Sequence, residues 1–190
     1  WTLFLLERKV SAVEPVMLEV VKFYPDYQFV VSTVKWLPKK LYDDILRGYD
    51  VKCALSQTYP LVLNAEAAIV TSGTATLETA ILGTRQVVCY KTSGVSYQIA
   101  KAVAKDTIKY ISLVNLVLDK PAVTELIQHD LTVEKLHDEV EKLLHDKATK
   151  ERISDDYSAL LQRLGGRGAS ARAAEIVRNC AKNGTSNIVK

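Results

Sequence analysis

Residues 69–78 read IVTSGTATLE, and this stretch decides the fold that we expect. It begins as an apolar, β-branched run that predicts a strand ending at Thr71, and it continues as a helix that starts at Gly73. Either Thr71 or Ser72 is the expected N-cap of that helix. A strand that turns at a glycine directly into a helix is typical of a βαβ unit, whose strands run parallel.

Strands and helices alternate on both sides of this corner. The expected strands are short and apolar throughout, as in a parallel sheet that is covered on both faces. Right-handed crossovers then predict an α/β fold with a doubly wound, Rossmann-like parallel sheet. The expected strands are 2–6, 27–33, 51–55, 67–71, 86–90 and 110–113, and the expected helices between them are 13–23, 38–46, 58–64, 73–82 and 95–103.

After Asn115 the pattern becomes helical to the end of the chain, with helices expected over 132–145, 150–164 and 170–179. We expect one domain over residues 1–182 that includes these C-terminal helices, followed by a disordered tail over 183–190. The chain of 190 residues begins at Trp1 rather than at Met, so we expect it to be part of a longer protein.

Composition excludes several classes of function. The formal net charge is only +3, whereas nucleic-acid binders concentrate basic charge on one face, so no nucleic-acid partner is expected. The three cysteines are widely separated and odd in number, which predicts reduced thiols in the cytoplasm rather than disulfides. No apolar run is long enough to span a membrane. The three histidines lack carboxylate or cysteine partners at ligand spacing, so no metal site is expected.

The corner after Thr71 has the features of an anion site. Ligands of open α/β sheets bind beyond the carboxyl ends of the strands, where a helix N-terminus attracts a diphosphate. Gly73 lets the backbone approach a ligand or adopt positive φ, and Ser72 and Thr74 add hydroxyl donors. Glu78, one turn later, would repel phosphate but could accept hydrogen bonds from both hydroxyls of a ribose. An ordinary capped helix with a solvated Glu78 is the alternative.

Neither GxGxxG after the first strand nor GxxxxGK[ST] is present, which argues against nicotinamide, flavin and P-loop chemistry. Instead, TSGTATLETAILGTRQVVCYKTS, KYISLVNL, TELIQ and LGGRGASARAA occur in the order found in the C-terminal half of lipid-A-disaccharide synthases, and the chain resembles that family over about residues 16–177. The resemblance implies one half of a GT-B glycosyltransferase, in which two Rossmann-like domains face each other across a cleft. It also implies that no metal and no cofactor are needed.

The implied reaction joins UDP-2,3-diacylglucosamine to 2,3-diacylglucosamine 1-phosphate, forms the lipid A disaccharide and releases UDP. In this family the C-terminal domain binds the UDP-sugar donor. The general base and the pocket for the acylated glucosamine acceptor are expected in the N-terminal half, so this chain alone should not transfer sugar. The UDP-sugar-binding residues that the resemblance implies are Arg8, Ser72, Gly73, Thr74, Glu78 and Asn115.

Several positions have an alternative explanation or depart from the family's pattern. Asn115, at the end of YISLVN, would reach the donor from a strand end, although an Asx turn is the alternative. Arg8 stands where the family has an arginine in a Pro-Gly-Ser-Arg loop, but this chain reads LLERKV over residues 5–10. Lys120 stands where the family often has an arginine. Glu125 matches the family but equally suits a structural cap or a salt bridge.

Acylated substrates imply a cytoplasmic protein that is peripheral to the inner membrane. Tyr97 and Ile99 could form an interfacial patch with nearby lysines, or could belong to an ordinary sheet-covering helix. These lysines are Lys91, Lys101, Lys105 and Lys109. A face that normally meets the other domain would also favour a homo-oligomer. The competing functions are another GT-B enzyme, such as a UDP-N-acetylglucosamine epimerase or a peptidoglycan transferase, and a non-catalytic interaction domain suggested by the altered loop at 5–10.

Overall fold

The computed structural model describes residues 2–6, 14–71, 73–91, 109–166 and 168–183. Six strands form one sheet in the order β3-β2-β1-β4-β5-β6, and every neighbouring pair is parallel. This is the doubly wound order of a Rossmann fold, which confirms the predicted fold class. The strands are β1 Thr2–Leu6, β2 Gln28–Thr33, β3 Val51–Leu55, β4 Ala67–Thr71, β5 Gln86–Tyr90 and β6 Thr124–Ile127.

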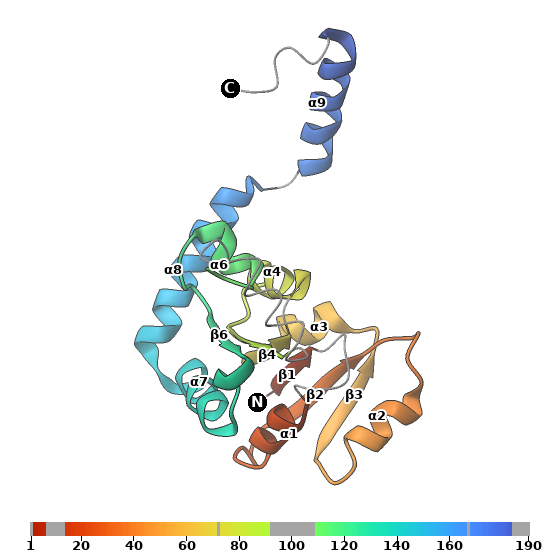
Figure 1. Ribbon diagram of the computed structural model, residues 1–190, viewed down its shortest axis with the longest axis vertical. Helices are drawn as coiled ribbons and strands as arrows, with labels where there is room; N and C mark the ends of the chain where they lie inside the picture. Colours follow the sequence, from red (N-terminus) through yellow and green to blue (C-terminus); the bar gives the residue numbers. More distant parts are fainter. Residues whose placement is uncertain (1, 7–13, 72, 92–108, 167, 184–190) are drawn as a thin grey trace.

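Helices cover both faces of the sheet (Figure 1). On one face α1 packs against α7, which also contacts β4, β5 and β6. On the other face α3 contacts β1 and β2, and α4 contacts β4 and β5. The helices are α1 Glu14–Val21, α2 Lys39–Ile45, α3 Thr58–Leu63, α4 Thr74–Ile81, α6 Leu113–Leu118, α7 Val133–His145, α8 Lys147–Leu164 and α9 Ala169–Asn183.

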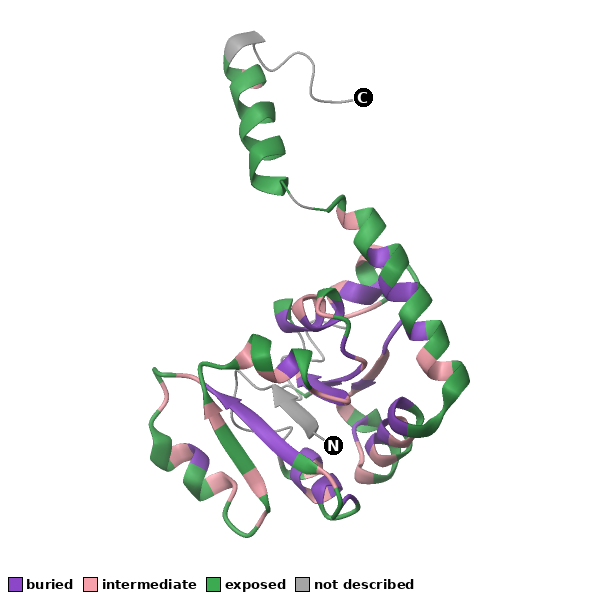
Figure 2. Cartoon of the chain, turned by 180° about the vertical axis from the view of Figure 1, so that it is seen from behind, coloured by how far each residue is buried: buried purple, intermediate pink, exposed green. Residues whose placement is uncertain are grey.

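Burial is greatest at the centre of the sheet. Residues 67–70 of β4 have no exposed surface, which is expected of a strand that is covered on both faces. The edge strand β3 differs, because none of its side chains is buried (Figure 2). Cys53 of β3 is exposed, whereas Cys89 of β5 is buried. An apolar run was therefore not sufficient to predict burial at the edge.

The prediction of a sixth strand over 110–113 is wrong. Ser112 adopts extended φ and ψ and its Oγ accepts a hydrogen bond from the Asn115 N–H, so that it caps helix α6. The Glu125 carboxylate accepts hydrogen bonds from the N–H groups of Ile111 and Ser112 at 2.9 and 2.8 Å. The sixth strand is β6, which also corrects the prediction that the chain is helical throughout after Asn115.

The C-terminal helices agree closely with the prediction. Thr132 caps α7, Asp146 caps α8, and Gly165 ends α8 in the left-handed conformation at φ 73°. Helix α9 then projects away from the sheet with nearly all of its described side chains exposed (Figures 1 and 2). No helix among the described residues is both long enough and apolar enough to span a bilayer. The predicted helix over 95–103 and residues 184–190 of the predicted tail lie outside the described residues.

Candidate functional site

The corner between β4 and α4 is built around Gly73. Gly73 is the N-cap residue, with φ 114° and ψ −160° and no side-chain cap, which corrects the predicted caps Thr71 and Ser72. Glycine populates this region readily whereas other residues do not. A Cβ at this position would meet no atom within 4 Å, so backbone conformation and not lack of space requires glycine. Ser72 lies outside the described residues.

The first turn of α4 is fixed from within. The Thr76 hydroxyl and the Thr76 N–H donate to the Gly73 carbonyl at 2.9 and 3.2 Å, and Thr76 is fully buried. Thr74, the first residue of the helix, remains exposed. Because the first N–H groups of a helix have no intrahelical acceptor, this end presents donors and partial positive charge to solvent. The described part of the corner therefore has the free N–H donors from which the sequence predicted an anion site, and anion binding there stays a prediction.

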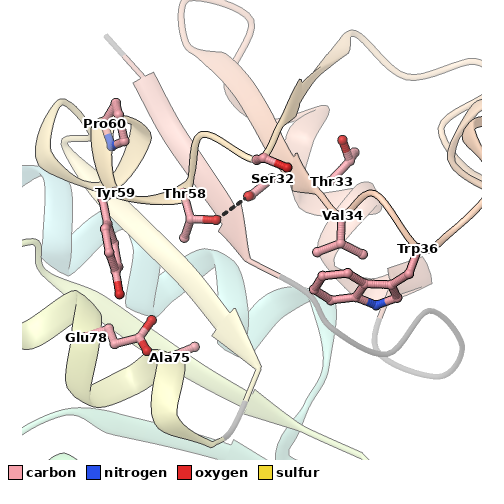
Figure 3. Close-up of a pocket in the computed structure, with 10 residues that line it drawn as sticks. Ser32, Thr33, Val34, Trp36, Thr58, Tyr59, Pro60, Ala75 and Glu78 are labelled. Carbon is pink, nitrogen blue, oxygen red and sulfur yellow. Dashed lines mark hydrogen bonds between the residues drawn. The ribbon is translucent and has the colours of Figure 1, made fainter.

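A cavity of about 350 Å³ opens beside this corner, at the carboxyl ends of the strands (Figure 3). Glu78 is half-buried and lines it, one turn of α4 after Thr74. With the described residues the Glu78 carboxylate makes no hydrogen bond or ion pair, so both of its oxygens can accept from a ligand. The lining residues are Ser32, Thr33, Val34, Trp36, Ser56, Thr58, Tyr59, Pro60, Ala75 and Glu78.

Two hydrogen bonds tie the walls of the cavity together. The hydroxyls of Ser32, at the end of β2, and Thr58, at the start of α3, lie 2.6 Å apart. The Ser56 N–H donates to the Thr33 carbonyl at 3.0 Å, and Ser56 itself has a positive φ of 57°. Residues held in the left-handed region are uncommon outside glycine and persist where the surroundings fix them. The cavity therefore has walls that are formed before any ligand binds.

Asn115 lies elsewhere and is already occupied. It is in helix α6 and not at a strand end, with 1% of its surface exposed. Its side-chain amide donates to the Val123 carbonyl at 2.8 Å and to the Glu125 carboxylate at 2.9 Å, and its oxygen accepts from the Val123 N–H at 2.9 Å. These bonds hold α6 against the chain that enters β6. We therefore leave Asn115 out of the site.

The remaining residues that the sequence suggested either have structural partners or lie outside the described residues. Glu125 caps the segment before α6, and Lys120 pairs with the buried Asp156, so both have structural partners. Arg8 lies outside the described residues, as do residues 92–108, which include most of the predicted membrane patch. Its two flanking lysines, Lys91 and Lys109, are exposed. Among the described residues no cluster of three or more His, Cys, Asp or Glu could hold a metal ion.

Sequence reasoning missed two aromatic residues of the cavity. Trp36 lies in the turn after β2 and Tyr59 in the first turn of α3, and their exposed fractions are 75% and 55%. Both follow the carboxyl end of a strand, which is where ligands bind in this fold. Their position after a strand could have indicated a ligand contact, but only the strand order shows which strand ends lie at the ligand site.

Comparison with known proteins places the chain in a family. A family model described as lipid-A-disaccharide synthetase matches residues 6–179. The lipid-A-disaccharide synthase of Syntrophus aciditrophicus is 35% identical over 173 residues, which cover 87% of this chain and 45% of that protein. The enzyme of the same name from Geobacter sulfurreducens is 31% identical over 175 residues, covering 89% and 45%. The chain thus spans less than half the length of these relatives.

Solved structures agree on the fold. The calicheamicin glycosyltransferase CalG4 matches with a TM-score of 0.61 at 18% identity, over 97% of this chain and 42% of that one. A putative UDP-N-acetylglucosamine 2-epimerase from Listeria monocytogenes matches at 0.57 and 14%, over 96% and 44%. These likenesses show the fold alone, which is one half of a GT-B fold. The family model and the sequence relatives decide the family. The chain belongs to the lipid-A-disaccharide synthetase family.

Proposed function

We propose that the chain is the UDP-sugar-binding half of a lipid-A-disaccharide synthase. The whole enzyme would transfer 2,3-diacylglucosamine from UDP to 2,3-diacylglucosamine 1-phosphate and release UDP. The observation that carries the proposal is the half-buried Glu78 carboxylate, which has no partner among the described residues and faces a cavity one turn after the Gly73 corner. The names of the relatives give the product, which is a lipid A disaccharide.

The spacing on α4 suits a nucleoside diphosphate. Four residues of helix rise about 6 Å, so Glu78 stands well back from the anion-binding end. We assign the diphosphate to the backbone at Gly73 and Thr74, together with Ser72, and the two ribose hydroxyls to Glu78. This arrangement keeps the carboxylate's negative charge away from the phosphates while using its two oxygens. Arg8 remains a predicted phosphate contact.

The same end of α4 would assist the reaction. As the acceptor hydroxyl forms its bond to the anomeric carbon, the bond from that carbon to the diphosphate breaks and negative charge accumulates on the leaving UDP. A helix N-terminus stabilises such charge without a metal. The proton of the acceptor hydroxyl would leave to a general base in the other half of the enzyme, so binding of UDP, but not transfer, is expected of this chain.

Calorimetric titration of UDP tests the proposal. Hydrogen bonds to a charged group contribute about 1.5–3 kcal/mol, so Glu78→Ala should weaken UDP binding about tenfold or more. Glu151→Ala, which removes an exposed carboxylate on α8, is the matched control and should leave binding unchanged.

A second ligand identifies the group that Glu78 holds. Because 2′,3′-dideoxy-UDP lacks the ribose diol, Glu78→Ala should not weaken its binding. Equal weakening of both ligands would contradict the assignment of the ribose, and absence of saturable UDP binding by the parent chain would favour a non-catalytic interaction domain.

The acceptor and the membrane complete the proposal. We place the acylated glucosamine acceptor in the other half of the enzyme, and the whole enzyme at the cytoplasmic face of the inner membrane, because both substrates carry acyl chains. Flotation of the full-length protein with liposomes tests this placement, and a protein that stays at the bottom of the gradient would contradict it. Assembly into a homo-oligomer stays a prediction.

A further inference from the structure

The Trp36 indole is the largest side chain on the wall of the cavity, and the turn that carries it is held by neighbouring residues. The Leu37 N–H donates to the Val34 carbonyl at 3.4 Å, closing the turn that carries Trp36. Leu37 packs against the core, and the hydroxyl of the buried Tyr42 accepts from the Val34 N–H at 3.4 Å. The turn is therefore anchored on both sides, while the Trp36 side chain remains 75% exposed.

The composition of the cavity favours a flat polar ring over an acyl chain. Trp36 and Tyr59 offer aromatic surface, and the lining between them carries the hydroxyls of Ser32, Ser56 and Thr58. A nucleobase has two apolar faces and an edge of hydrogen-bond donors and acceptors, which matches such a lining. The Ser32 and Thr58 hydroxyls already bond to each other, but an acyl chain would use neither the remaining acceptor capacity of this pair nor the Ser56 hydroxyl. The volume of about 350 Å³ lies at the lower end of small-molecule sites.

The position of Glu78 fixes where the ring would lie. Figure 3 shows the Glu78 carboxylate and the Trp36 indole on opposite sides of the same cavity, with the Tyr59 hydroxyl directed toward Glu78. A ribose whose hydroxyls bind Glu78 would carry its base into the space between them. We propose that Trp36 is the stacking surface for the base of the donor nucleotide, an inference that rests on the proposed donor site.

Substitution of Trp36 tests the stacking. Because base–aromatic stacking is lost on alanine substitution, Trp36→Ala should weaken UDP binding roughly 5- to 100-fold. Trp36→Phe, which keeps a ring, should retain most of the affinity. Phe23→Ala removes an aromatic side chain of 56% exposure outside the cavity lining and should leave binding unchanged. Since Trp36 is exposed, loss of folding is not expected, and circular dichroism checks it.

Ligand variation separates stacking from other contacts. Every base has an aromatic face, so Trp36→Ala should weaken UDP, dTDP and ADP by similar factors. It should also weaken 2′,3′-dideoxy-UDP as much as UDP, because the base contact does not involve the diol. Trp1 is the only other tryptophan in the sequence, so in a Trp1→Phe background UDP should quench the Trp36 emission and inorganic pyrophosphate should not.

The outcomes distinguish this inference from the proposed function. UDP binding that weakens with Glu78→Ala but is unchanged by Trp36→Ala, or Trp36 emission that stays constant at saturating UDP, would overturn the stacking role alone. A parent chain that binds no UDP would overturn both. Weakening by Trp36→Ala, retention by Trp36→Phe and quenching by UDP together would establish Trp36 as the base-stacking residue.

Discussion

Replacing Asn115 by alanine separates its two assignments, as a donor ligand and as a structural residue. The side chain makes three hydrogen bonds, two to the backbone of Val123 and one to Glu125. Val123 and Asn115 are both 1% exposed, so water cannot easily replace the lost partners. The substitution should therefore reduce the free energy of unfolding and leave the donor site unchanged.

The magnitude follows from the two backbone groups that lose their partner. A buried donor or acceptor left without a hydrogen bond costs about 1–3 kcal/mol, so the N–H and C=O of Val123 together predict a loss of about 2–6 kcal/mol. A domain of this size is stabilised by about 5–15 kcal/mol, so the variant should still fold at low temperature. Urea unfolding followed by circular dichroism measures the loss.

The control lies on the same helix. Leu116 of α6 is 46% exposed, and Leu116→Ala should change the free energy of unfolding by about 0.5 kcal/mol or less. UDP affinity of folded Asn115→Ala, measured well below its unfolding midpoint, should equal that of the parent. Normal stability combined with a large loss of UDP affinity would refute the structural assignment and restore Asn115 as a donor contact.

Two further predictions concern the corner and the buried hydrogen bonds behind it. Gly73→Ala should cost about 1–3 kcal/mol of stability from backbone strain and should weaken UDP binding; unchanged calorimetric affinity would contradict the role of the corner. Tyr157→Phe removes a buried hydroxyl that donates to the Thr84 carbonyl and accepts from Gln86, both at 3.2 Å, and should cost about 1–3 kcal/mol. Burial raises the pKa of Tyr157 above its ordinary value, so the folded protein keeps this hydroxyl neutral. The loss of unfolding free energy in Tyr157→Phe should therefore be the same at every pH below about 9. A loss that varies with pH over that range would contradict the assignment of a neutral hydroxyl.

Local pattern was sufficient for most of the fold. Five of the six predicted strands occur within a residue of their expected bounds, because short β-branched runs bounded by turn residues have few alternatives. The alternation of those strands with helices predicted the parallel sheet. Glycine at position 73 suggested either close approach to a ligand or positive φ, and the structure has positive φ there. Glu78 could be named as a candidate ligand contact because its one-turn spacing from Thr74 on a helix is fixed by helix geometry alone.

The misassigned strand shows where local pattern is insufficient. The run ISLVNL over 111–116 is apolar and short, so its spacing suits a strand and a buried helix equally. Contacts more distant along the chain decide between them, since the Glu125 carboxylate binds the N–H groups of Ile111 and Ser112 and the Asn115 side chain binds Val123. These groups would be needed for pairing in a strand, so their use by Glu125 and the Ser112 cap favour the helix.

The cavity was beyond sequence reasoning for a topological reason. Trp36 and Glu78 are 42 residues apart and follow β2 and β4, which are not neighbours because β1 lies between them. In the sheet, β2 and β3 follow on one side of β1, and β4, β5 and β6 follow on the other. The carboxyl ends of β2 and β4 therefore lie on either side of the point where the strand order changes direction, and the residues that follow them border one cavity. Ligands of open α/β sheets bind at such a point, and the Gly73 corner lies there. Which aromatic residue forms the opposite wall depends on the turn after β2, whose anchoring by Leu37 and Tyr42 involves tertiary contacts that no local pattern encodes.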